Sequence, residues 1–179
     1  MLRPRTMVLI GMILAAALSR LIPHPPNMAS VAAVALFGGA CFHDRRMAFL
    51  VPLAALFLSD LVLGFYRHME VIYSSFALIV CIGLWLRRSR SAPRIASAAL
   101  AGSLLFFLLT NLGVWAFGSL YPKTLDGLIT CYTAAIPFLG NTLQGDALYT
   151  AVLFGGFAML ERRFSRLREP SIPPGLSLA

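Results

Sequence analysis

One carboxylate stands inside an otherwise uncharged apolar stretch of this sequence. Asp60 is the only charged residue between Met47 and Tyr66. A helix over this stretch is about 30 Å long, which is the thickness of a bilayer's hydrocarbon core, and Asp60 then lies about two-thirds of the way across. A carboxylate at that depth costs at least ~2.5 kcal/mol, so it should face protein or water rather than lipid. Asp60 therefore either ties helices together through a hydrogen bond or lines a polar cavity.

Other polar side chains are predicted to lie toward the same end of their helices as Asp60. Polar residues that only hold helices together would be scattered through the depth of the membrane, so this convergence indicates a water-accessible pocket that opens on one side. Arg20, Tyr73 and Gln144 could instead extend to the membrane surface. Arg20 is also the natural counter-ion of Asp60 or Asp146. The candidate substrate-binding residues are Arg20, His24, Asn27, Asp60, Tyr73, Asn111, Asn141, Gln144 and Asp146.

The sequence contains none of the motifs that would indicate catalysis or nucleotide hydrolysis. It has no Walker motif, no GxSxG elbow and no HExxH helix. Its three cysteines, Cys41, Cys81 and Cys131, share no close spacing, which argues against a zinc site or a disulfide framework. We therefore expect no enzyme activity, no catalytic residue, no metal and no cofactor.

The composition identifies the chain as an integral membrane protein. Its 179 residues are 59% hydrophobic and only 12% charged, and the mean hydropathy is +0.80. A soluble domain averages about 45–50% apolar and ~25% charged residues. The formal charge of +8 is explained by basic cytoplasmic loops, so nucleic acid is not expected as a partner.

Apolar runs separated by proline-rich or charged turns predict an all-α fold with six membrane-spanning helices. Thr110 and Asn111 interrupt the fifth span. Thr124 is a suitable N-cap for a short helix that ends near Ala135, before Pro137, and is too short to cross the membrane. The predicted spans are Met7–Ile22, Met28–Phe42, Arg46–Tyr66, Val71–Leu86, Ile95–Phe117 and Thr142–Leu160.

Basic residues divide unevenly between the two sides of these spans. Only Arg20, Arg67 and Lys123 fall on one side, and the other twelve of the 15 Lys and Arg residues fall on the opposite side. The positive-inside rule then places both termini in the cytoplasm. The expected organisation is a six-helix membrane domain over residues 1–164 and a basic, proline-rich tail over residues 165–179. The first helix also resembles a signal peptide, but its apolar character continues through Ile22, which favours a retained helix.

Four segments resemble a family of small, uncharacterised bacterial membrane proteins. The segments are residues 20–40 (RLIPHPPNMASVAAVALFGGA), 58–66 (LSDLVLGFY), 108–125 (LLTNLGVWAFGSLYPKTL) and 134–157 (AAIPFLGNTLQGDALYTAVLFGGF). More broadly, six helices, an outward pocket and a segment lying before the last helix resemble the substrate-binding (S) components of energy-coupling-factor vitamin transporters. That resemblance implies uptake of a small vitamin-like solute from the outer side of the bacterial inner membrane. It also implies membrane lipid and coupling or ATPase subunits as partners.

The solitary cobalamin-binding S components are the most similar, because they have an HxP-type turn after the first helix and an Asp in the third. On that match His24 and Asp60 would contact the substrate. Those proteins place a cobalt-binding cysteine near the start of the fourth helix, where this chain has residues 71–75 (VIYSS), and Cys81 lies further inward. The resemblance therefore does not identify the solute. The alternative is a non-transporting membrane scaffold on the same fold, resembling rod-shape-determining membrane proteins.

Overall fold

The structure, a computed structural model, describes residues 3–168, which form helices joined by short loops. The α-helices are α1 (Pro4–Leu18), α2 (Val31–Cys41), α3 (Arg45–Leu63), α4 (Met69–Leu86), α5 (Ala92–Phe117), α6 (Leu125–Thr150) and α7 (Gly156–Arg163). Short 3-10 segments, η1 (Ser19–Leu21) and η3 (Ser165–Leu167), follow α1 and α7, and a π-helical segment, η2 (Ala151–Gly155), joins α6 to α7. The predicted all-α fold is confirmed, and the described residues contain no strand.

Within residues 3–168, five of the helical stretches are long and apolar enough to cross a membrane. They are Pro4–Leu21, Arg45–Leu63, Met69–Leu86, Ala92–Phe117 and Leu125–Arg163. This pattern is consistent with a multi-pass membrane protein. The predicted span Met28–Phe42 contains only the 11 residues of α2, and a helix of that length covers about 16 Å, roughly half of the hydrocarbon core.

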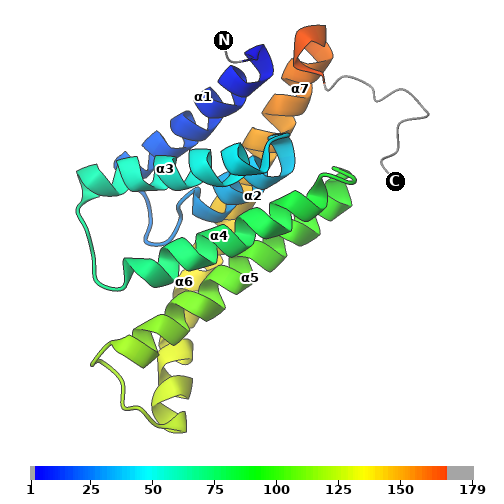
Figure 1. Cartoon of the computed structure of the whole chain (residues 1–179). Coiled ribbons are helices and arrows are strands. Elements are labelled where there is room, and N and C mark those ends of the chain that lie inside the picture. Colours follow the sequence, from blue (N-terminus) through cyan, green and yellow to red (C-terminus); the bar gives the residue numbers. More distant parts are fainter. Residues whose placement is uncertain (1–2, 169–179) are drawn as a thin grey trace.

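α2 is the buried axis of the bundle, with the longer helices around it (Figure 1). Every residue from Ala32 to Cys41 is buried. A Cβ atom on Gly39 would lie 2.3 Å from the Val80 carbonyl oxygen and 2.8 Å from the Gly83 Cα atom, so the backbones of α2 and α4 touch there. Only glycine permits such a close approach of two helices.

The helix before the last predicted span is longer than the sequence indicates. Thr124 caps it as predicted, because its Oγ1 accepts a hydrogen bond from the Gly127 backbone N at 3.2 Å. The helix does not end at Ala135, however, but continues through Pro137 to Thr150 as α6. Pro137 removes one backbone hydrogen bond, and packing against α5 compensates, including a 2.7 Å hydrogen bond from the Tyr132 hydroxyl to the Leu108 carbonyl. The prediction of a separate short interfacial helix is wrong.

α5 is likewise continuous where an interruption was predicted. The Thr110 hydroxyl donates to the Phe106 carbonyl at 2.7 Å, and the Asn111 amide donates to the Phe107 carbonyl at 2.8 Å. Both polar side chains therefore bond to carbonyls one turn earlier in their own helix, and the helix does not need to break.

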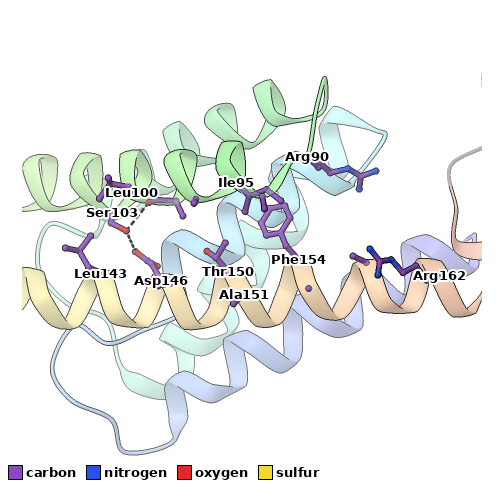
Figure 2. A pocket seen from close by; sticks show the side chains of 16 residues that line it. Arg90, Ile95, Leu100, Ser103, Leu143, Asp146, Thr150, Ala151, Phe154 and Arg162 are labelled. Carbon is purple, nitrogen blue, oxygen red and sulfur yellow. Dashed lines mark hydrogen bonds between the residues drawn. The ribbon is translucent and has the colours of Figure 1, made fainter.

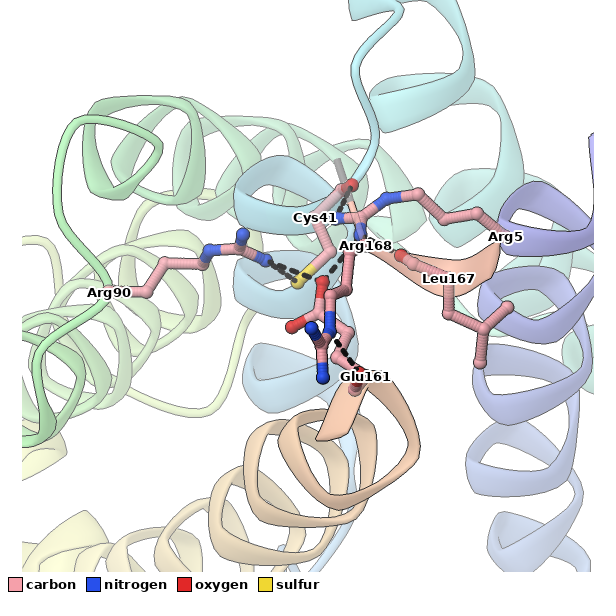
Figure 3. A network of polar contacts seen from close by, with 6 residues as sticks. All are labelled: Arg5, Cys41, Arg90, Glu161, Leu167 and Arg168. Carbon is pink, nitrogen blue, oxygen red and sulfur yellow. Dashed lines mark hydrogen bonds and ion pairs between the residues drawn. The ribbon is translucent and has the colours of Figure 1, made fainter. Parts of the chain in front are cut away.

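α1 and α7 meet at one end of the bundle (Figure 1). Arg5 donates to Glu161 Oε1 at 2.5 Å and to the Leu167 carbonyl at 2.6 Å. Arg90, from the loop between α4 and α5, lies 4.0 Å from the same Glu161 oxygen (Figure 3). Leu167 is buried, so the first residues of the predicted tail pack on the bundle. Residues 169–179 of that tail lie outside the described residues.

Candidate functional site

A proline-rich turn places three of the predicted binding residues at the opposite end of α1. Pro23, Pro25 and Pro26 prevent the helix from continuing, so α1 tightens into η1. This turn carries Arg20, and the loop after it carries the exposed side chains of His24 and Asn27. Asn27 has a φ of 63°, a left-handed conformation that asparagine tolerates better than most residues.

Arg20 and Asp60 form an ion pair between η1 and α3. Arg20 Nη2 donates to Asp60 Oδ1 at 2.9 Å, and Arg20 Nη1 donates to the Ser59 hydroxyl. The Asp60 side chain is fully buried and that of Arg20 is 13% exposed. The predicted role of Arg20 as a counter-ion is confirmed, and its partner is Asp60 rather than Asp146.

Two tyrosines occupy the second oxygen of Asp60. Tyr73 on α4 donates to Asp60 Oδ2 at 2.9 Å, and Tyr66 in the loop between α3 and α4 donates to it at 3.4 Å. Burial, followed by the charge of Asp60, raises the pKa of Tyr66 to about 12, so its hydroxyl stays protonated and can donate. We call the set Arg20, Ser59, Asp60, Tyr66 and Tyr73 the Asp60 network.

Asp146 on α6 is a second buried carboxylate with a different environment. Its Oδ2 accepts from the Ser103 hydroxyl at 2.7 Å, and its Oδ1 accepts from the Ala33 backbone N in the first turn of α2 at 3.3 Å. A carboxylate at a helix N-terminus satisfies an otherwise unpaired N–H and interacts favourably with the helix dipole. Among the described residues, no Arg, Lys or His forms an ion pair with Asp146.

A polar cavity of about 220 Å³ lies between these two carboxylates. Its apolar wall includes Leu56, Ile72 and Phe106. Its polar lining residues are Arg20, His24, Asn27, Tyr66, Thr142 and Asp146. Sequence reasoning missed Tyr66 and Thr142. Thr142 could have been found, because it lies one turn before Asp146 and therefore on the same face of the helix.

The other predicted binding residues do not line this cavity. Asp60 and Tyr73 lie behind its wall and connect to it through Arg20 and Tyr66. Asn141 donates to the Pro26 carbonyl at 3.0 Å and so holds the proline-rich loop. Asn111 bonds within its own helix, and Gln144 is exposed on α6. The described residues contain no group of His, Cys, Asp or Glu that could hold a metal ion.

A longer, mainly apolar groove of about 790 Å³ runs between α5 and the continuous α6–α7 helix (Figure 2). Ser103 and Asp146 lie toward one end, and Arg90 and Arg162 lie at the other (Figure 2). We call it the long groove. Asp146 lines both the long groove and the polar cavity. The hydroxyl of Thr150, which also lines the groove, is buried and has no hydrogen-bond partner among the described residues.

Long apolar helices packed around buried charges are typical of helical membrane proteins with several spans. Residues 1–170 match a family described as a family of unknown function, DUF6580, and the chain belongs to this family. No curated protein and no solved structure matches the chain.

Proposed function

We propose that this protein is a solute-binding membrane subunit that takes up a small vitamin-like solute, and that the polar cavity is its binding site. The proposal rests on the convergence of polar groups at this cavity from the loop after α1, the loop after α3 and α6. The cavity volume of about 220 Å³ is below the ~300–1,000 Å³ typical of sites for drug-sized ligands, which favours a smaller molecule.

The charges around the cavity favour a solute with a cationic or hydrogen-bond-donating group. Asp60 already neutralises Arg20. Asp146 faces the cavity and has no basic ion-pair partner within residues 3–168. A buried carboxylate without a cation is unfavourable by several kcal/mol, and the donors Ser103 and Ala33 offset only part of that cost. A positive or donor group on the solute would complete the site, with His24 and Asn27 at the exposed rim.

The proposed topology has six membrane crossings, both termini in the cytoplasm and the polar cavity open to the outside. Arg5 in the first turn of α1 and Arg90 in the loop before α5 both approach Glu161 near the end of α7. Placing this end of the bundle at the cytoplasmic face requires an even number of crossings between Arg5 and Arg90. The stretches there that are long enough to cross alone are three: Pro4–Leu21, α3 and α4. An even number requires a fourth crossing in this part of the chain. This supports a crossing by residues 22–44, which contain the short helix α2.

Uptake also requires an energy source that the sequence does not encode. We propose that coupling or ATPase subunits supply it, as in the energy-coupling-factor transporters whose S components this chain resembles, within a bacterial inner membrane. Solute binding at the polar cavity needs none of these partners, so it can be measured on the isolated protein.

A thermal-shift screen of vitamins and metal complexes on the purified protein tests the proposal. We expect at least one solute to stabilise the protein, and Asp146→Asn and Thr142→Val to remove that stabilisation. Thr110→Val is the matched control, because Thr110 and Thr142 both donate to a carbonyl one turn earlier but only Thr142 lines the cavity. A screen without any stabiliser, or a response that survives both cavity substitutions, would reject the proposal.

A non-transporting scaffold is the second candidate, and the Asp60 network favours it. Both oxygens of Asp60 are engaged by protein groups from η1, α4 and the loop before α4. A buried network whose members are all paired holds helices in one arrangement, which is the role a scaffold needs. On this alternative no small solute stabilises the protein, and substitutions in the network disrupt folding or an assembly.

A further inference from the structure

The half of the long groove nearest Arg162 has apolar walls on both sides. Ile95 and Ala99 on α5 face Ala151 and Phe154 across it (Figure 2 labels Ile95, Ala151 and Phe154). Gly155 also lines it, and a Cβ atom on Gly155 would meet no protein atom within 4 Å. This part of the groove is therefore open, and it offers no hydrogen-bonding side chain before Thr150.

Positive charge is concentrated at the end of the groove. Arg162 is exposed, and within residues 3–168 its guanidinium forms no ion pair. Arg90 lines the same end, where it also contacts the Cys41 sulfur at 3.7 Å. Glu161, which precedes Arg162 on α7, is held by Arg5 at 2.5 Å and lies 4.0 Å from Arg90. Within residues 3–168, the two groove arginines and Arg5 are therefore set against one acidic partner, Glu161, so the described part of this end carries net positive charge.

The length of the apolar part matches one leaflet of a bilayer. The 11 residues from Arg162 back to Ala151 correspond to about 16 Å of helix, and half of a hydrocarbon core is ~15 Å. Asp146 lies 16 residues, or about 24 Å, from Arg162 and so falls in the opposite leaflet. An acyl chain that starts at Arg162 would end before it reached the polar Ser103–Asp146 pair.

We propose that this half of the long groove binds one anionic phospholipid, with its phosphate at Arg90 and Arg162 and an acyl chain along Ala99, Ala151 and Phe154. Basic pockets between transmembrane helices bind anionic head groups in this way. The site is separate from the polar cavity, and it stands whether or not the protein takes up a solute.

Binding of phosphatidylglycerol and phosphatidylcholine to the purified protein in detergent tests this site, with native mass spectrometry to count bound lipid and thermal shift to measure stabilisation. We expect phosphatidylglycerol to bind more tightly than phosphatidylcholine. Arg162→Gln should weaken phosphatidylglycerol binding roughly five-fold, because an arginine near the membrane surface contributes about 1 kcal/mol to anionic-lipid binding. Arg163→Gln is the charge-matched control, since Arg163 is exposed on the same helix but does not line the groove.

A second pair of variants tests the groove by its shape. Gly155→Leu should fill the groove and abolish lipid retention. Gly11→Leu is its matched control, because a Cβ atom on either glycine would meet no protein atom within 4 Å and Gly11 lies outside the groove. We expect Gly11→Leu to bind phosphatidylglycerol like the unaltered protein.

Four results would overturn the proposal. Equal losses for Arg162→Gln and Arg163→Gln would mean general attraction to a charged surface. Full binding by Gly155→Leu would place the lipid elsewhere. Stabilisation by inorganic phosphate equal to that by phosphatidylglycerol would identify a free anion as the ligand. A dimer that Gly155→Leu dissociates, with no dependence on lipid, would assign the groove to a second copy of the chain.

Discussion

Arg20 and Asp60 lie 40 residues apart in the sequence, yet their side chains form a 2.9 Å ion pair that joins η1 to α3. Arg20 is the only charged residue between Met7 and Ile22, and Asp60 is the only one between Met47 and Tyr66. Burying either charge alone would be unfavourable, whereas the pair carries no net charge. The ion pair also fixes the position of the proline-rich turn relative to α3.

The first prediction follows from this pair. Arg20→Ala should lower the free energy of unfolding by about 3–5 kcal/mol, because it leaves Asp60 charged and buried without a cation. Denaturant unfolding in detergent measures the change. The double variant with Asp60→Asn should lose less than the sum of the two single variants, by ~0.5–3 kcal/mol. Simple additivity would show that the two charges do not stabilise each other.

A second prediction concerns the contact between α2 and α4. Gly39→Ala places a methyl group 2.3 Å from the Val80 carbonyl oxygen, and neither backbone can move without disturbing the buried axis. We expect a loss at or above the upper end of the ~1–3 kcal/mol seen for overpacked cores. Gly11→Ala, on an open helix surface, should be neutral or stabilise by up to ~1 kcal/mol. Equal melting temperatures for the two variants would contradict the close approach.

The proposed topology predicts opposite labelling at the starts of α5 and α6. In a background without the three native cysteines, Ser91→Cys should be protected from a membrane-impermeant thiol reagent in intact cells, and Asp126→Cys should react. Both side chains are exposed in the fold, so protein burial does not explain a difference between them. External labelling of Ser91→Cys would overturn the six-crossing arrangement.

The hydroxyl of Thr150 provides a fourth prediction. It is buried without a hydrogen-bond partner among the described residues, so Thr150→Val should keep the shape and remove an unsatisfied polar group. The expected result is an unchanged or higher melting temperature, since an unpaired buried hydroxyl costs about 1–3 kcal/mol. A clear decrease in melting temperature would mean that this hydroxyl has a partner, such as a bound water.

Tyr66 provides a prediction about pH. Its pKa is raised to about 12, above the ordinary value of about 10, so its protonated form is favoured by folding. The resulting stabilisation is complete below pH ~10 and is lost as the pH rises from ~10 to ~12. The difference in absorbance at 295 nm between the protein and Tyr66→Phe should therefore show ionisation near pH 12. A midpoint near 10 would contradict the hydrogen bond from Tyr66 to Asp60.

Much of the helical framework could be predicted from the sequence, because apolar runs and proline-rich turns act locally. The start of α6 at Thr124 depends on a single capping side chain and was predicted. The continuation of α6 through Pro137 depends on contacts with α5, such as the hydrogen bond from the Tyr132 hydroxyl to the Leu108 carbonyl. No local sequence pattern reveals such contacts.

The position of a candidate site residue along its helix could be predicted from the sequence, but the direction of its side chain could not. The rise per residue fixes how far along its helix Asn111 lies, but it does not say which way the side chain points, and Asn111 bonds to its own helix instead of lining the cavity. The same limit applies to Asp146. Its depth was inferred, whereas its contact with Ala33, 113 residues away, depends on how α2 and α6 pack.

The contact between Arg5 and Glu161 also sets an order for assembly of the chain in the membrane. The two residues are 156 positions apart, so at ~5–20 residues per second the ribosome needs roughly 8–30 s to make the partner after Arg5 has emerged. During that interval α1 has neither Glu161 nor the Leu167 carbonyl to hold its first turn. The bundle can close at this end only after residues 161–167 have been synthesised, so α1 can join α7 only after the helices between them have been made.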